Sequence, residues 1–112
     1  MRDIRERIER IVEVLDEKKG EEIEVFDLQD SDYIAKEVVM VSSLGGRHTQ
    51  ALLDHLKETL KPEGEEFIST DESDEWIVVD LGDIIIHIMT PQYRRRYDIE
   101  HFLQEIARKE AE

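Results

Sequence analysis

The sequence has no cysteine among its 112 residues, and this absence excludes disulfide bonds and thiolate metal sites. The lack of cysteine is consistent with a reducing compartment. No apolar run approaches the roughly 20 residues that cross a bilayer, and the first residues lack the apolar core of a secretory signal. We therefore expect a soluble protein of the cytoplasm.

Basic residues are also few, with 15 Lys and Arg against 29 Asp and Glu, for a formal net charge of −14. A surface this acidic repels phosphate backbones, so direct binding of nucleic acid is not expected. Residues 21–39 carry seven acids against Lys36, and residues 63–83 carry nine acids and no Lys or Arg. Acidic surfaces most often serve solubility. The second block contains Trp76, the only tryptophan, and this favours a docking face for a basic protein.

Proline and glycine are sparse, at two and five residues, and the apolar residues between them recur regularly. A period of 3.6 residues indicates a helix, and short β-branched runs indicate buried strands. The predicted elements are a helix from Ile4 to Leu15 with Gly20 as its C-cap, strands at 23–28 and 37–43, a helix from about His48 to Leu60 that ends before Pro62, a short edge strand at Phe67–Ile68, a strand pair within Trp76–Met89, and a helical region from Pro91 through Ile106. This order predicts one domain over residues 1–112 with an α/β fold, in which a small mixed sheet is flanked by helices.

The strand pair within Trp76–Met89 contains polar residues that a hairpin does not need, namely Asp80, Asp83 and His87. A metal site using His87 is not expected, because no pair of histidines has zinc-ligand spacing. The two acids flank a turn, where such residues usually bond nearby backbone amides. A hydrolytic triad with Ser42 is not expected either, because the sequence has no nucleophile elbow.

Two other motifs have plain structural interpretations. Gly45-Gly46-Arg47-His48 precedes a helix, but its spacing matches neither a P-loop nor GxGxxG, so a flexible turn explains both glycines. In Arg94-Arg95-Arg96 we expect one arginine to pair with an acid of the neighbouring sheet while the others stay solvated. Three arginines seldom form a nucleic-acid site alone, because phosphate binding uses a wider basic surface.

An ordered set of residues extends over nearly the whole chain, from about Lys19 to Phe102. The set consists of Lys19-Gly20-Glu21-Glu22-Ile23 leading to Asp27, then Arg47-His48 at a helix start, then Trp76, Asp80, Gly82-Asp83 and His87, followed by Arg94, Tyr97 and Glu100. In its order and spacing this set resembles the ribosomal silencing factor family, also called the Iojap-like family. The chain departs from the usual family pattern in three places. Ala35-Lys36-Glu37 replaces an Asp-Tyr-Phe-like entry to the second strand, and Ser43 replaces a glycine after that strand. Leu103 stands where the family usually has a tryptophan, and a leucine can fill the same apolar position.

The resemblance implies a nucleotidyltransferase-like α/β sandwich without the catalytic acids. It also implies a bacterial translation repressor that binds the large ribosomal subunit through ribosomal protein L-fourteen, with minor contacts to ribosomal RNA, and sterically blocks joining of the small subunit. No catalytic, cofactor-binding or metal-binding residue is expected. The residues expected to bind the partner are Trp76, Asp80, Asp83, His87, Arg94 and Tyr97.

Two other hypotheses stay open. The fold analogy suggests a nucleotide-binding or nucleotidyltransferase-like enzyme. Such an enzyme would need paired metal-binding acids after a Gly-Ser turn, whereas Gly45-Gly46 is followed here by Arg47-His48. Alternatively, the surface around Trp76 could form a homodimer, and the sequence does not separate a dimer from a monomer.

Overall fold

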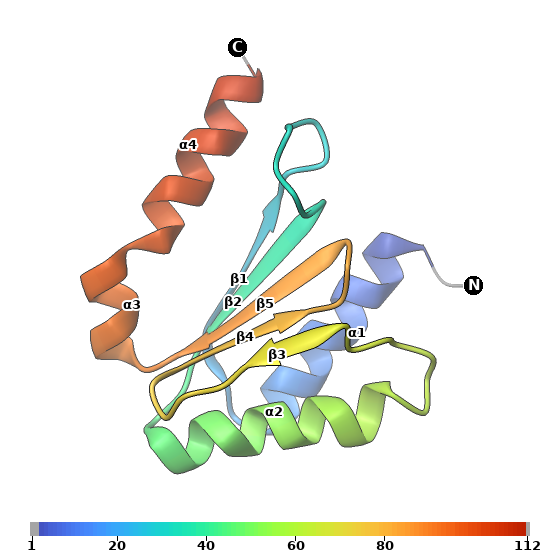
Figure 1. Cartoon of the computed structure of the whole chain (residues 1–112), viewed down its shortest axis with the longest axis vertical. Helices are drawn as coiled ribbons and strands as arrows, with labels where there is room; N and C mark the ends of the chain where they lie inside the picture. Colours follow the sequence, from blue (N-terminus) through green and yellow to red (C-terminus); the bar gives the residue numbers. More distant parts are fainter. Residues whose placement is uncertain (1–2, 112) are drawn as a thin grey trace.

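A five-stranded sheet forms the centre of the molecule, with helices packed on both of its faces (Figure 1). The computed structural model describes residues 3–111, with side chains as far as residue 107. The strands are β1 (Glu21–Asp27), β2 (Glu37–Ser42), β3 (Ser69–Asp71), β4 (Trp76–Asp80) and β5 (Ile84–Met89). The helices are α1 (Ile4–Glu17), α2 (Gly46–Leu60), α3 (Pro91–Tyr97) and α4 (Ile99–Ala111). None of the helices in this described part is long and apolar enough to cross a membrane.

The sheet is mixed, with its strands in the order β1-β2-β5-β4-β3. β2 and β5 run parallel, from the pair Glu37 and Ile84 to the pair Ser42 and Met89. The other three pairs are antiparallel. Parallel neighbours need a long crossover, and here the chain between β2 and β5 forms α2, β3 and β4. The predicted α/β fold with a small mixed sheet is therefore confirmed.

The larger core lies between the sheet and helices α1 and α2. Strands β2 and β5 are buried along their whole length, as their β-branched runs predict. The helices contribute apolar residues at helical spacing, and burying each such side chain stabilises the fold by about 1.5–3 kcal/mol. The fully buried large side chains of this core include Ile11, Leu15, Leu52, Leu53, Leu56, Leu60, Ile77, Ile84, Ile86 and Ile88.

The opposite face of the sheet is covered by α3 and α4, and this cover is incomplete over β4. The buried residues here are Phe26, Leu28, Ala35, Val38, Met40, Ile85, Met89 and Leu103. Leu103 is fully buried, so the leucine does fill an apolar position. Trp76 and Val78 pack against the same core but are only partly buried. Partly open apolar surface of this kind often marks an interaction site.

Helix α1 ends in a Schellman motif. The amide of Gly20 donates to the Leu15 carbonyl at 2.9 Å, and the amide of Lys19 donates to the Asp16 carbonyl at 3.0 Å. The left-handed residue is Lys19, with a φ of 64°, and not the glycine predicted as the cap. Gly20 is needed for another reason, because a Cβ there would lie 2.6 Å from Cγ2 of Val41. The close approach of the helix end to β2 therefore requires glycine.

Most predicted boundaries differ from the structure by one or two residues, and β1, for example, begins at Glu21 and not at Ile23. Three differences are more informative. Helix α2 begins at Gly46, two residues before the predicted start. The edge strand is Ser69–Asp71 and not Phe67–Ile68. Phe67 packs against the larger core, and Ile68 is 58% exposed. The final helical region is two helices, because Asp98 takes a left-handed φ of 44° between them, a conformation that aspartate tolerates better than most residues.

Candidate partner-binding site

Trp76 is the first residue of β4 and is fixed there through its backbone. Its amide donates to Oγ of Ser73 at 3.2 Å, and the Ser73 hydroxyl donates to the Trp76 carbonyl at 2.9 Å. The carbonyl of Glu75 accepts from the amide of Thr90 at 3.0 Å. The strand register then pairs Trp76 with Met89. The turn before β4 thus sets the position from which the indole contacts α3.

Four rings form an aromatic cluster, defined here as Trp76, His87, Tyr93 and Tyr97. The Trp76 and Tyr97 ring centroids are 5.2 Å apart, those of Trp76 and His87 are 5.9 Å apart, and those of Tyr93 and Tyr97 are 5.5 Å apart. These separations are typical of tilted aromatic contacts. The guanidinium of Arg96 lies over the Tyr97 ring, 5.8 Å from its centroid. Since Tyr97 is 48% exposed and Trp76 only partly buried, the cluster reaches the surface.

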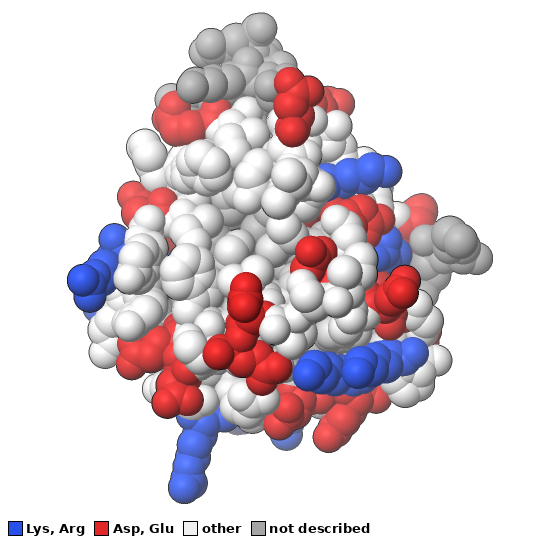
Figure 2. Space-filling model, in the orientation of Figure 1, with Lys and Arg blue, Asp and Glu red and all other residues white. Residues whose placement is uncertain are grey.

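An open groove with acidic residues in its wall adjoins the aromatic cluster. It has a volume of about 350 Å³ and is lined by Asp71, Glu72, Ser73, Trp76, Val78 and Tyr93. Figure 2 shows how widely acidic groups are spread over one face of the molecule, among and around uncharged side chains. The residues that line the groove combine apolar surface with negative charge, which suits a partner that is both apolar and basic.

His87 lies in the middle of β5, next to Trp76, and is 9% exposed. Its Nδ1 accepts a hydrogen bond from the indole Nε1–H at 3.0 Å. A ring nitrogen must be unprotonated to accept, so the neutral imidazole carries its proton on Nε2. Burial lowers the pKa of His87 to about 4, and the ring is therefore neutral at physiological pH.

Arg94 is buried, at 4% exposed, and ties α3 to the sheet and to α4. Its guanidinium donates to Oγ of Ser42 at 2.9 Å, to Glu24 at 3.1 Å and to Glu100 at 2.6 Å. Burial and a hydrogen bond with Glu100 raise the pKa of Glu24. Burial works against ionisation of Glu100 too, but the hydrogen bond and charge of Arg94 outweigh it and lower the pKa of Glu100. One arginine of the triplet thus pairs with an acid of the sheet, as predicted, and the next two are exposed.

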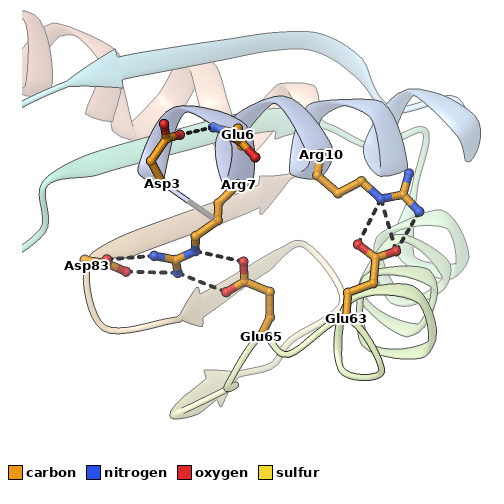
Figure 3. Close-up of polar contacts among 7 residues, drawn as sticks. All are labelled: Asp3, Glu6, Arg7, Arg10, Glu63, Glu65 and Asp83. Atoms are coloured by element: carbon orange, nitrogen blue, oxygen red, sulfur yellow. Dashed lines mark hydrogen bonds and ion pairs between the residues drawn. The ribbon is translucent and has the colours of Figure 1, made fainter. Parts of the chain in front are cut away.

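Asp80 and Asp83 lie at the opposite end of the β4–β5 hairpin from the aromatic cluster. Oδ1 of Asp80 accepts from the Gly82 amide at 2.7 Å, as the turn pattern predicts. Asp83 pairs with Arg7 of α1 at 2.8 and 3.0 Å, and this hydrogen bonding lowers the pKa of Asp83 (Figure 3). The same guanidinium binds Glu65 through two contacts of 2.9 Å. These contacts join α1, the loop before β3 and the hairpin turn.

The six predicted partner-binding residues therefore fall into three places. Trp76, His87 and Tyr97 form one cluster, the buried side chain of Arg94 lies between α3 and the sheet, and the two acids lie at the far turn. Tyr93 and Ser73 belong to the site and were not predicted. The spacing of Tyr93 and Tyr97, four residues apart on a helix, is a signal that could have identified the former. Nothing in the sequence marks Ser73 beyond its place before β4.

The Gly45–Gly46 loop is held by His48. Its Nδ1 accepts from the Leu44 amide at 2.9 Å, and its Nε2 donates to the Lys18 carbonyl at 2.6 Å. The loop thus links β2 and α2 to the end of α1, in line with the turn interpretation. Among the described residues, no group of three or more histidine and acidic side chains could hold a metal ion.

Comparison with known proteins adds an independent observation. The family model described as ribosomal silencing factor during starvation matches residues 1–112. The ribosomal silencing factor RsfS of Chromobacterium violaceum is 30% identical over 100 residues, covering 88% of this chain and 82% of that protein. RsfS of Haemophilus influenzae is 33% identical over 95 residues, covering 83% of this chain and 93% of that protein. A crystal structure of a C. violaceum protein matches with a TM-score of 0.87 at 28% identity, covering 92% of this chain and 88% of that one.

Proposed function

The chain belongs to the ribosomal silencing factor family, and from this membership we propose that it binds the large ribosomal subunit through ribosomal protein L-fourteen. Bound there, in the bacterial cytoplasm, the single domain of residues 1–112 sterically blocks joining of the small subunit and represses translation. It acts by occupying a surface, without chemistry and without a cofactor. The observation that carries the proposal is the position of Trp76, which is partly open beside an acidic groove.

The aromatic cluster has the character of a binding hot spot. Tryptophan and tyrosine are enriched at such spots, because they supply a large rigid contact area. Trp76 and Tyr97 are in contact and both reach the surface. Asp71 and Glu72 line the groove beside Trp76 and would form the polar rim of the interface.

The charge of the chain supports the same partner. Ribosomal proteins are commonly basic, because they lie against RNA. A domain with a net charge of −14 is attracted to such a protein and repelled by exposed RNA, and it gains association rate and discrimination from both effects. The exposed Arg95 and Arg96 of α3 are candidates for the minor contacts with ribosomal RNA.

The partner-binding residues divide by role in this proposal. Trp76 and Tyr97 make direct contact, while Arg94 holds α3 in place behind them. Asp80 and Asp83 stay predictions as partner-binding residues. Their hydrogen bonds support a role in shaping the hairpin turn, at the far end of β4 from Trp76.

Co-sedimentation with large ribosomal subunits, with and without competing small subunits, tests the proposal. Trp76→Ala should weaken binding by about 30-fold or more, which corresponds to the hot-spot threshold of about 2 kcal/mol. Ile34→Ala is the matched control, because Ile34 is apolar, 82% exposed and outside the aromatic cluster. Circular dichroism would confirm that both variants are folded. Binding of Trp76→Ala at wild-type strength would contradict the proposal.

Self-association through the Trp76 surface is a further proposal that is compatible with this one, because a homodimer would cover the docking face until the partner arrives. Sedimentation equilibrium at several protein concentrations would detect it. For the nucleotidyltransferase-like alternative, the described residues contain no group of three or more histidine and acidic side chains that could hold a metal ion.

A further inference from the structure

His87 occupies a position where an apolar residue would be easier to bury. Its strand neighbours are Val78 in β4 and Met40 in β2, and Met40 is fully buried. Burial penalises the charged imidazole so strongly that its pKa falls to about 4. The side-chain hydrogen bond described for His87 is the one that it accepts from Trp76. The orientation of the indole is therefore the benefit that we expect to offset the cost of burying His87.

The hydrogen bond fixes which parts of the Trp76 ring remain available. Nε1–H is the only polar group of an indole, and here it points at Nδ1 of His87. The ring also packs against Tyr97, with centroids 5.2 Å apart, while Ser73 holds the backbone on both its donor and its acceptor side. Rotation of the indole to another rotamer would break the bond to His87. The exposed part of Trp76 is thus hydrocarbon in a set orientation.

We propose that His87 is a positioning residue for docking, which accepts from the Trp76 indole and so holds that ring ready for the partner with its N–H turned inward. This inference rests on the proposed function. It specifies the chemistry of the contact: the partner meets the ring with apolar atoms and offers no acceptor to the indole nitrogen. Fixing the ring in advance removes the cost of immobilising it on binding, a cost equivalent to about 2- to 10-fold in affinity for one large side chain.

The orientation can be tested without the ribosome, because Trp76 is the only tryptophan and gives a single indole N–H signal in a ¹⁵N-labelled sample. In the wild type, the ¹⁵N shifts of His87 should report an unprotonated Nδ1 and a protonated Nε2. His87→Leu should move the indole signal and speed its exchange with solvent. His87→Asn, which places an amide oxygen near the position of Nδ1, should keep the signal hydrogen-bonded.

The binding arm uses the same variants with large subunits. His87→Leu should lose about 2- to 10-fold in affinity, and His87→Asn should stay close to wild type. Met40→Leu is the matched control, a volume-conserving change at the neighbour of His87 in β2, and it should leave both readouts unchanged. Rescue by asparagine separates loss of the acceptor from loss of packing.

Each outcome decides a different statement. If the wild type does not bind large subunits, the proposed function fails, while the nuclear magnetic resonance data still decide whether His87 holds the indole. If the wild type binds and His87→Leu moves the indole signal without weakening binding, the positioning role is overturned and the proposed function stands. A protonated Nδ1 in the folded wild type overturns the positioning role even if the leucine variant does not fold.

Discussion

Thr90, between β5 and α3, is 4% exposed, and its hydroxyl has no hydrogen-bond partner among the described residues. A buried hydroxyl without a partner costs about 1–3 kcal/mol. Valine has the same shape and no such cost, so Thr90→Val should raise the free energy of unfolding by about 1 kcal/mol. Urea unfolding followed by circular dichroism measures this change.

Thr49 is the matched control for Thr90. It is also buried, but its hydroxyl bonds the Ser43 hydroxyl at 2.6 Å and the Gly45 carbonyl at 2.9 Å. Thr49→Val should lower the free energy of unfolding by about 1–2 kcal/mol, because it leaves these groups without their partner. Equal destabilisation by the two valines would show that the Thr90 hydroxyl is paired in solution.

His87 gives the free energy of unfolding a defined pH dependence. Its pKa is about 4 in the folded protein and near 6.5 in an unfolded chain, so the unfolded chain binds more protons between these values. The stability that depends on a neutral His87 is fully present above pH 6.5. It falls as the pH drops towards 4, by about 3 kcal/mol.

A comparison of the wild type with His87→Asn separates the contribution of His87 from that of the other titrating groups. Glu24 and Glu37 have raised pKa values, mainly through burial, and Asp83 has a lowered one through Arg7. These groups titrate in wild type and in His87→Asn alike. The stability difference between the two proteins, from urea unfolding at several pH values, should be flat above pH 6.5 and change steadily below it. A difference that stays constant down to pH 4.5 would mean that His87 is protonated without cost.

At the scale of elements, the buried strands were the easiest to predict. The runs at β2 and at the β4–β5 hairpin are apolar and β-branched, and such local patterns determine a strand directly. The ends of elements depended on single backbone conformations that the sequence does not mark. Lys19 and Asp98 both adopt positive φ although neither is glycine, and these residues end α1 and separate α3 from α4.

Helix α3 has only seven residues, and its attachment depends on Arg94. Arg94→Met would leave Glu24 and Glu100 without their cation, so it should lower the free energy of unfolding by about 3 kcal/mol, the lower end for a broken buried pair because Glu24 is partly exposed. Arg94→Lys keeps the charge but loses the fork of donors. Its free energy of unfolding should lie between that of the wild type and that of Arg94→Met. Urea unfolding gives the values.

Arg95 supplies the control for this prediction. It is exposed and lies next to Arg94 on α3, so Arg95→Met should change the free energy of unfolding by less than about 0.5 kcal/mol. If Arg94→Met were as mild as Arg95→Met, the contacts with Ser42, Glu24 and Glu100 would not be what holds α3 on the sheet.

At the scale of the whole molecule, the fold class could be predicted, because it depends on local pattern and composition. The role of Trp76 in binding rests on the same kind of pattern and stays a prediction. The arrangement of the site could not. The partners of His87 and Arg94 lie 11 and up to 70 residues away in sequence, and only the sheet order brings them together. Arg7 likewise contacts an acid 76 residues away. Such pairs follow from topology and are invisible to periodicity.

The net charge of −14 predicts that binding to isolated ribosomal protein L-fourteen weakens as salt is added. Between about 0.05 and 0.5 M salt the screening length falls severalfold, and the affinity should drop by about tenfold, mainly through slower association. Surface plasmon resonance measures both rates.

The double variant Asp71→Asn with Glu72→Gln, in the groove beside Trp76, should flatten this salt response. Asp30→Asn with Asp32→Asn, in the exposed loop between β1 and β2, removes the same charge away from the groove and should change it less. A wild-type affinity that does not depend on salt would rule out electrostatic steering and leave the apolar contact of Trp76 as the source of recognition.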